Sequence, residues 1–253
     1  MPELNAIGYN PPNLTNPVFP LTDDAMTTDH EALFRFYDLT NGNRVVGDTL
    51  DNELAGYAAA TVTAVGGAGY IPIGAASKGV AFASGSQTIT LPTSFDVLQA
   101  PQDRDVVIAI GLTLGSDPAG TLALAGKMRN TATCQWGILL NGGILQTRFG
   151  NGGQNLVAAP AAASSYLITY HFKATGGAQR NVDAWADDAK VVTYNYTPDD
   201  SGGYPPVLGT TGSVVSLAGM VIHEAQIFTP PSGYDPAAWI AAERAKLTAD
   251  LAG

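Results

Sequence analysis

The residues best suited to chemistry lie in one stretch of the chain, which reads YNYTPDDSGGY from Tyr194 to Tyr204. Tyr194, Tyr196 and Tyr204 offer aromatic faces, which can stack on the apolar faces of sugar rings. Asp199 and Asp200 offer carboxylate oxygens, which accept hydrogen bonds from sugar hydroxyls or ligate calcium. The stretch predicts an exposed glycan-binding loop that needs no cofactor, with calcium left open as a ligand. The alternative is an ordinary long turn whose tyrosines pack over the core.

A second polar loop reads NGGQN from Asn151 to Asn155. Its glycines favour a turn, and its amide side chains can both donate hydrogen bonds to hydroxyl groups and accept them. Asn151 is therefore a further candidate for glycan binding.

The three histidines, His30, His171 and His223, are isolated from one another in the sequence. His171 alternates with Tyr170 and Phe172, which is typical of a strand. A partner across a sheet stays open for each of them, but we expect hydrogen-bonded structural histidines rather than a catalytic or metal-binding pair.

Short alternating strands separated by glycine-rich turns fill most of the chain. The clearest signal is Asn141-Gly142 between two apolar runs, because both residues accept the positive φ angles of a tight hairpin turn. About a dozen such strands predict an antiparallel sandwich or barrel. The main expected strands are residues 33–39, 80–82, 87–91, 104–114, 122–127, 136–140, 144–149, 166–172, 181–186, 190–196 and 219–228.

The two ends of the chain have different patterns. Residues 1–30 are rich in proline and asparagine, and proline fits neither a helix interior nor a central strand. We expect an extended arm docked on its own domain, a symmetry mate or a larger assembly, with a disordered tail as the alternative.

Near the other end, Asp235 can cap a helix with Pro236 at its first position. Its apolar stripe is then Trp239, Ile240, Leu247 and Leu251, packed on the sandwich.

Composition narrows the class of protein. Charged residues make up 13% of the 253, against about 25% in an average globular protein, and the net charge is −10. Such a chain is unsuited to nucleic-acid phosphates, and it has no apolar run long enough for a membrane helix. Cys134 is the only cysteine, so no internal disulfide forms, and we expect it to be buried. No secretory signal is visible, which predicts synthesis in a cytoplasm without classical export.

The order of these segments resembles the concanavalin A-like, laminin-G-like sandwich domains, over residues 33–250. The matching segments are Gly79–Pro92, Asp105–Leu114, Trp136–Phe149, Ser165–Tyr170, Val182–Val191 and Gly219–Phe228. Two segments depart from the pattern: Asp187-Asp188 replaces the usual Asp-Gly turn, and Asp38–Asn43 replaces the usual acidic loop. The resemblance implies an all-β, two-sheet antiparallel jelly-roll sandwich. It also implies a module that binds glycans or proteins, in some members with calcium at the sandwich rim.

Glycan hydrolases with a jelly-roll fold resemble one another through a strand carrying Glu-x-Asp-x-x-Glu, which places an acid and a nucleophile or base on one face. This chain has no such triplet, and its acidic pairs Asp187/Asp188 and Asp199/Asp200 fall in turns. We therefore expect no catalytic residue, and a protein that is not an enzyme.

The expected organisation is an arm at 1–30, a sandwich at 31–230 and a packed C-terminal helix at 231–253. Many bacteriophage structural proteins carry such domains, so we expect a non-catalytic virion protein of the capsid surface, tail or fibre, synthesised in the host cytoplasm. Its predicted partners are other virion proteins through the arm, further copies of itself, by analogy as a trimer, and a host surface glycan. The alternatives are a jelly-roll glycan hydrolase or lyase and a free bacterial lectin.

Overall fold

The computed structural model of the chain describes residues 30–83, 85–97, 104–115, 121–131, 133–198, 203–211 and 219–252. The predicted arm at 1–30 lies outside these ranges except for His30. Asp199 and Asp200, two of the predicted glycan-binding residues, lie outside them as well.

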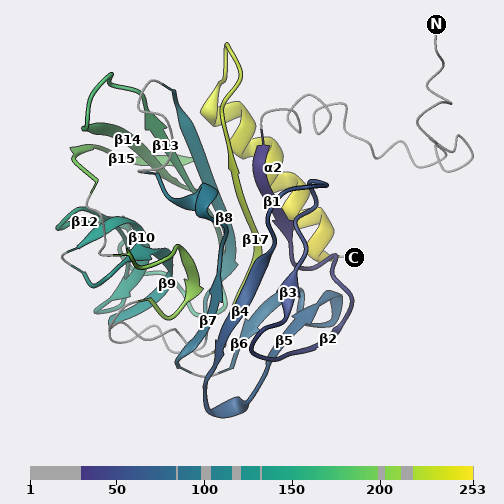
Figure 1. Cartoon of the computed structure of the whole chain (residues 1–253). Helices are drawn as coiled ribbons and strands as arrows, with labels where there is room; N and C mark the ends of the chain where they lie inside the picture. The colour runs from purple at the N-terminus through teal and green to yellow at the C-terminus, as the bar shows by residue number, and fades with distance from the viewer. Residues whose placement is uncertain are drawn as a thin grey trace, which may run out of the picture.

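Two antiparallel sheets face each other and form a β-sandwich (Figure 1). Sheet A has the order β15 (Ala189–Tyr196), β14 (Arg180–Ala186), β13 (Ser165–Lys173), β8 (Val106–Thr113), β17 (Met220–Phe228), β6 (Gly79–Phe82), β5 (Ile71–Gly74) and β2 (Gly42–Arg44), and β1 (His30–Arg35) also pairs with β17. Sheet B has the order β12 (Gly152–Val157), β11 (Ile144–Phe149), β10 (Cys134–Asn141), β9 (Thr121–Met128), β16 (Val207–Gly209), β7 (Gln87–Thr90), β4 (Ala60–Val65) and β3 (Thr49–Leu50). Three short 3₁₀ helices, η3 (Gly66–Ala68), η4 (Ala75–Ser77) and η5 (Thr93–Phe95), lie in connections. The predicted all-β, two-sheet sandwich with a C-terminal helix is confirmed.

The hairpin predicted at Asn141-Gly142 joins β10 to β11, with Asn141 opposite Ile144. The two turn residues are Gly142 and Gly143, with φ angles of 59° and 77°, which glycine adopts readily, whereas Asn141 is the last residue of β10 and does not take a positive φ angle. The turn therefore has the two positive φ angles of a type I′ hairpin, the geometry that matches strand twist.

Two local predictions differ from the structure. The first strand ends at Arg35 instead of residue 39. The strands predicted at 80–82 and 87–91 are present as β6 and β7; β6 pairs within sheet A and β7 within sheet B, so their connection crosses the sandwich. The polar segment at 151–155 is mostly the strand β12, because its backbone pairs with β11 and an edge strand tolerates polar residues on both faces.

The main core lies between the two sheets and is rich in aromatic side chains. Trp136 and Tyr170 are fully buried there, with ring centroids 6.2 Å apart. Their polar atoms are paired with backbone carbonyls: Trp136 Nε1 donates to Phe95 O at 2.8 Å and Tyr170 Oη to Gly137 O at 3.2 Å. Cys134 is buried as predicted.

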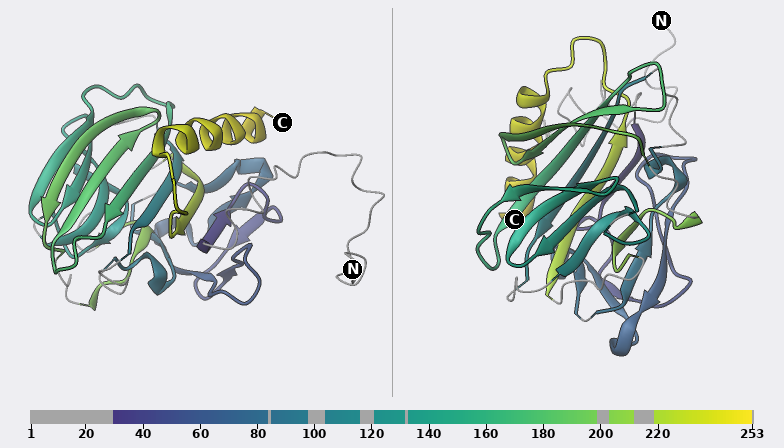
Figure 2. Two further views of the ribbon diagram at one scale, coloured as in Figure 1. Left: turned by 90° about the horizontal axis from the view of Figure 1, so that it is seen from above. Right: turned by 90° about the vertical axis from the view of Figure 1, so that its left-hand side faces the viewer.

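A smaller core lies on the outer face of sheet A, under the helix α2 (Pro236–Ala252), which crosses that face (Figure 2). Asp235 caps the helix as predicted, since its Oδ1 accepts from the N–H groups of Ala237 at 3.0 Å and Ala238 at 3.4 Å. Of the predicted stripe, Trp239, Ile240 and Leu247 are buried, and Leu251 is partly buried. No helix among the described residues is both long and apolar enough to cross a membrane.

Candidate functional site

The two polar segments singled out in the sequence meet at one edge of the sandwich. The edge strand β15 of sheet A lies beside the edge strand β12 of sheet B. Between them is a hollow of about 360 Å³, lined by residues 149–151 of the β11–β12 turn and by residues 194–197 at the end of β15. Tyr194, Tyr196 and Asn151, which are far apart in sequence, therefore share one site.

Aromatic rings form the floor of this edge hollow. The rings of Phe149 and Tyr194 are nearly parallel, with centroids 6.2 Å apart and planes at 24°, and Tyr194 is half-buried. Tyr196 lies 5.3 Å from Phe149 and is only 7% exposed. Its hydroxyl donates to Gln135 O at 2.6 Å, and burial raises the pKa of Tyr196 well above its usual value. Tyr194 thus offers a partly exposed ring, whereas the Tyr196 ring is buried, with its centroid 6.4 Å from that of Tyr194.

The rim of the edge hollow is polar and uncharged. Asn151, Asn195 and Thr197 are exposed there, and none of the described residues that line the hollow carries a charge. Arg148 Nη1 donates to Asn151 O at 3.4 Å, and this hydrogen bond stabilises the turn that carries Asn151. Amide and hydroxyl groups around an aromatic floor can exchange hydrogen bonds with the hydroxyls of a sugar whose apolar face lies on the ring.

Tyr204, which the sequence also suggested, does not line this hollow, although it is exposed at 39%. Phe149, Gly150 and Gly152 were missed by sequence reasoning. Phe149 reads as an ordinary inward-facing strand residue, so no local signal marks it. The NGG run at Asn151 did mark the turn, but the need for glycine at 152 comes from Tyr194: a Cβ there would overlap the Tyr194 hydroxyl.

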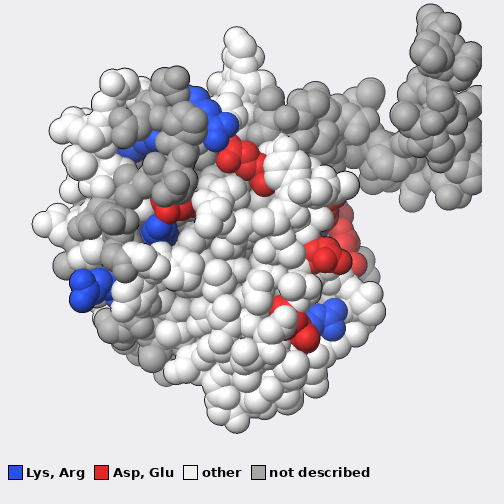
Figure 3. Space-filling model, viewed as in Figure 1, with Lys and Arg blue, Asp and Glu red and all other residues white. Residues whose placement is uncertain are grey.

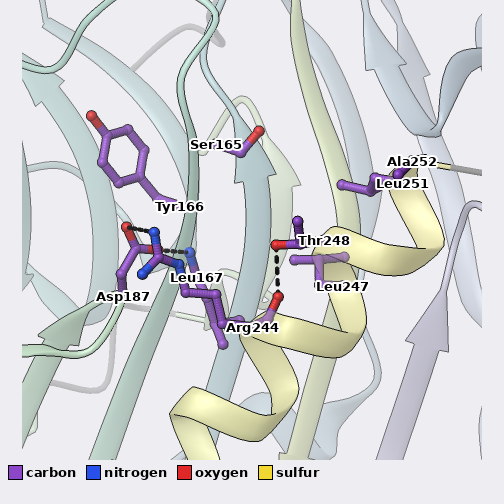
Figure 4. Close-up of a pocket in the computed structure, with 9 residues that line it drawn as sticks. All are labelled: Ser165, Tyr166, Leu167, Asp187, Arg244, Leu247, Thr248, Leu251 and Ala252. Carbon is purple, nitrogen blue, oxygen red and sulfur yellow. Dashed lines mark hydrogen bonds and ion pairs between the residues drawn. The ribbon is translucent and has the colours of Figure 1, made fainter.

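Another hollow, of about 340 Å³, lies between α2 and β13 (Figure 4). Its wall is largely apolar, with Leu167 from β13 and Leu247 from α2. Arg244 reaches from the helix to Asp187 Oδ2 at 3.4 Å, and Asp187 Oδ1 accepts from Leu167 N at 2.9 Å. These polar groups are already engaged within the protein and fasten the helix to the sheet.

Two buried glutamates, Glu224 on β17 and Glu243 on α2, lie on either side of Gln226. Gln226 Nε2 lies 3.5 Å from Glu224 Oε1 and 3.2 Å from Glu243 Oε1, and both glutamates are buried. Burial, and then the charge of Glu243, raise the pKa of Glu224 well above its usual value. Neither carboxyl lines the hollows at the edge or beside β13, so this pair does not have the open geometry of a glycosidase.

All three histidines are hydrogen-bonded, as predicted. His30 Nε2 lies 3.1 Å from Gln226 Oε1, His171 Nε2 lies 2.8 Å from Asp105 Oδ2, and His223 Nε2 lies 2.7 Å from Thr113 Oγ1. Within the described ranges, no three His, Cys, Asp or Glu side chains gather as a metal site would require.

The fold is shared with solved proteins, although no protein-family model and no curated protein sequence matches the chain. It is similar to a mutant of Trypanosoma rangeli sialidase displaying trans-sialidase activity, with 13% identity and a TM-score of 0.55 over 90% of this chain and 34% of that one. Trypanosoma rangeli sialidase gives 13% identity and a TM-score of 0.53 over 83% and 31%. The binding domain of botulinum neurotoxin DC, solved with rat synaptotagmin II, gives 10% identity and a TM-score of 0.49 over 88% and 52%. The chain thus spans about a third of the length of the two sialidases.

These neighbours contradict the prediction that the chain is not an enzyme, because the sialidase and its mutant are both enzymes. That prediction depended on the missing Glu-x-Asp-x-x-Glu triplet. The triplet belongs to one group of glycan hydrolases, and other glycosidases use different nucleophiles, so its absence excludes only that group. The two-sheet β-sandwich itself is what the chain and these enzymes share.

Proposed function

We propose that this chain is a glycan-binding β-sandwich whose sugar lies in the edge hollow against Tyr194, and that a bacteriophage virion displays it. The observation that supports the site is the half-buried Tyr194 ring, which lies on Phe149 and is surrounded by the exposed side chains of Asn151, Asn195 and Thr197. Stacking on Phe149 holds the Tyr194 ring in place, so little side-chain entropy is lost when a sugar binds.

The charge of the surroundings favours a neutral glycan. The described residues that line the hollow are uncharged, and most of the described surface seen in Figure 3 is uncharged as well. With a net charge of −10, the protein as a whole repels anions at long range. Recognition would therefore depend on hydroxyl hydrogen bonds and ring stacking.

The virion setting is supported by the sequence alone. The proline- and asparagine-rich residues 1–30 suit an arm that docks on a larger assembly, and the low charged fraction suits a particle surface. We include in the proposal the contacts with other virion proteins, a homo-oligomer such as a trimer, and a glycan of the host surface as the ligand.

A glycan array tests the site. Wild-type protein should bind a discrete set of glycans, and Tyr194→Ala should weaken that binding at least tenfold. Tyr57→Ala, which removes another exposed tyrosine outside the edge hollow, is the matched control and should bind like the wild type. Equal losses in both variants, or an undiminished signal in Tyr194→Ala, would refute this site. Repeating the array with a chelator decides whether calcium takes part.

Hydrolysis of the bound glycan is a second candidate function, favoured by the fold shared with a sialidase. Incubation of the protein with sialyllactose and with each glycan that the array identifies, followed by chromatography of the products, tests it. Release of a free sugar that grows with protein concentration would support catalysis, and intact glycans after prolonged incubation would reject it.

A further inference from the structure

A second polar hollow, of about 440 Å³, lies on the outer side of sheet A. Its lining includes Arg104 and Asp105 just before β8, His171 on β13, and the loop from Thr229 to Tyr234 that leads into α2. It is at the same end of the sandwich as the edge hollow. Arg180, at the start of β14, lies opposite Tyr196 and donates from Nη1 to Arg104 O at 3.3 Å.

Asp105 fixes the orientation and tautomer of His171. Asp105 Oδ2 lies 2.8 Å from His171 Nε2, and its Oδ1 accepts from Ala174 N, also at 2.8 Å. Nε2 is thereby the protonated nitrogen, and Nδ1 is left as an acceptor. Burial lowers the pKa of His171, although its hydrogen bond to Asp105 acts in the opposite direction. The imidazole is therefore neutral near pH 7.

Three polar atoms of residues that line this hollow have no hydrogen-bond partner among the described residues. They are His171 Nδ1, the hydroxyl of Tyr234 and Arg104 Nε, and all three atoms are buried. The rings of His171 and Tyr234 meet edge to face, with centroids 5.5 Å apart and planes at 87°. His171 as a whole is only 8% exposed. A hydrogen-bond acceptor and a phenol donor are thus held side by side, screened from bulk water.

The charges around them select against an anion. Arg104 Nη2 lies 2.6 Å from Glu31 Oε1, and Arg104 Nη1 donates to Thr229 Oγ1 at 2.9 Å. The charge of Arg104 is therefore paired with that of Glu31, although its Nε has no partner. The partly exposed Asp105 carboxylate then leaves the hollow negative. Lys173, the next cation along β13, is paired with Asp183 at 2.6 Å.

We propose that this hollow is a second ligand site, which binds a neutral, hydroxyl-rich molecule such as a simple sugar. One ligand hydroxyl donates to His171 Nδ1, and another oxygen accepts from the Tyr234 hydroxyl. The ligand class follows from the proposed glycan-binding function, but the residues are distinct from those of the edge hollow, so the two sites fail independently.

The test is an NMR titration of protein labelled with ¹⁵N in its histidine rings. The probes are methyl β-galactoside, which is neutral, and the methyl glycoside of sialic acid, which is anionic. The galactoside should shift the His171 Nδ1 signal in a saturable way, and the anionic probe should bind at least tenfold more weakly. Tyr234→Phe keeps the ring and loses only the hydroxyl, so it should fold normally and bind the galactoside at least fivefold more weakly. Tyr194→Ala should leave this titration unchanged.

Three results would overturn the proposal. One is a His171 signal that ignores both probes, which would mean that only buried water satisfies Nδ1. Another is equal galactoside binding by wild type and Tyr234→Phe. The third is loss of the His171 response in Tyr194→Ala, which would place the sugar at the edge hollow alone.

Discussion

Gly152 lies directly beneath the hydroxyl of Tyr194, where a Cβ on residue 152 would overlap that oxygen. This contact between Gly152 and Tyr194 joins the edge strands of the two sheets. Gly152 begins β12 in sheet B, and Tyr194 belongs to β15 in sheet A. The position of the Tyr194 ring over Phe149 therefore depends on the missing side chain at residue 152.

Gly152→Ala should push the Tyr194 ring off this position and weaken glycan binding by about tenfold, or about 1.4 kcal/mol. The obstacle is the end of one side chain and not the backbone, so the free energy of unfolding should fall by less than about 1 kcal/mol. Isothermal titration with the best array ligand and urea unfolding measure the two effects. Gly177→Ala is the control, since a Cβ at that position meets nothing within 4 Å. Unchanged affinity in Gly152→Ala would show that the Tyr194 ring does not need this position.

Local signals were enough to predict much of the fold. Asn141-Gly142 marks its hairpin and Asp235-Pro236 marks its helix start, because turn and cap preferences are set by a few neighbouring residues. The crossing between β6 and β7 was not predictable in this way, because β6 pairs with β17 and β7 pairs with β16, and both partners lie far along the chain.

In both proposed sites, the residue types could be predicted from the sequence, but the contacts between distant residues could not. Tyr194 and Asn151 could be named from residue type, but their meeting depends on β15 and β12 being the edge strands on the same side of the sandwich. The pairing of His171 with Asp105 likewise depends on the register of β13 and β8, which places His171 opposite Val107. Side-chain chemistry was visible in the sequence, whereas long-range register was not.

Asp235→Ala should loosen the start of α2. The substitution removes the acceptor for the N–H groups of Ala237 and Ala238 and should lower the free energy of unfolding by about 1 kcal/mol. Asp235→Asn should retain most of the stability, because asparagine caps nearly as well. Thermal unfolding of the two variants compares them, and equal stability of Asp235→Ala and wild type would mean that the smaller core under Trp239 holds the helix alone.

Asp183 should stabilise the protein at neutral pH. Burial raises the pKa of Asp183, but hydrogen bonds from Lys173, Thr193 and Lys190 outweigh it and lower the value to about 2. Since the folded pKa is below that of the unfolded chain, this stability is present above the unfolded pKa and is lost as the pH falls towards 2. At about 1.4 kcal/mol per pKa unit, Asp183→Asn should lose on the order of 2 kcal/mol at pH 7, and less at pH 3. Urea unfolding at pH 7 and at pH 3 measures the two losses, with Asp188→Asn at an exposed position as the control. A loss of stability that is the same at both pH values would contradict the ionic explanation.

Glu224 should have the opposite pH dependence. Burial raises the pKa of Glu224 well above its usual value, the nearby Glu243 carboxylate raises it further, and the charges of Arg35 and Lys246 only partly offset this. The folded protein then keeps a proton that the unfolded chain releases, so the stability from the neutral acid is present at low pH and is lost as the pH rises through the raised pKa. Glu224→Gln keeps a neutral hydrogen-bonding side chain beside Gln226 at every pH.

The variant should therefore be more stable than wild type at pH 8, and the difference should disappear as the pH approaches about 4, the ordinary range of a glutamate. Urea unfolding at several pH values measures this difference, and Glu53→Gln, at a partly exposed ion pair with Arg35, serves as the control. A Glu224→Gln protein that is less stable than wild type at pH 8 would mean that Glu224 is ionised in the fold and stabilised by Arg35 and Lys246, which outweigh the repulsion from Glu243.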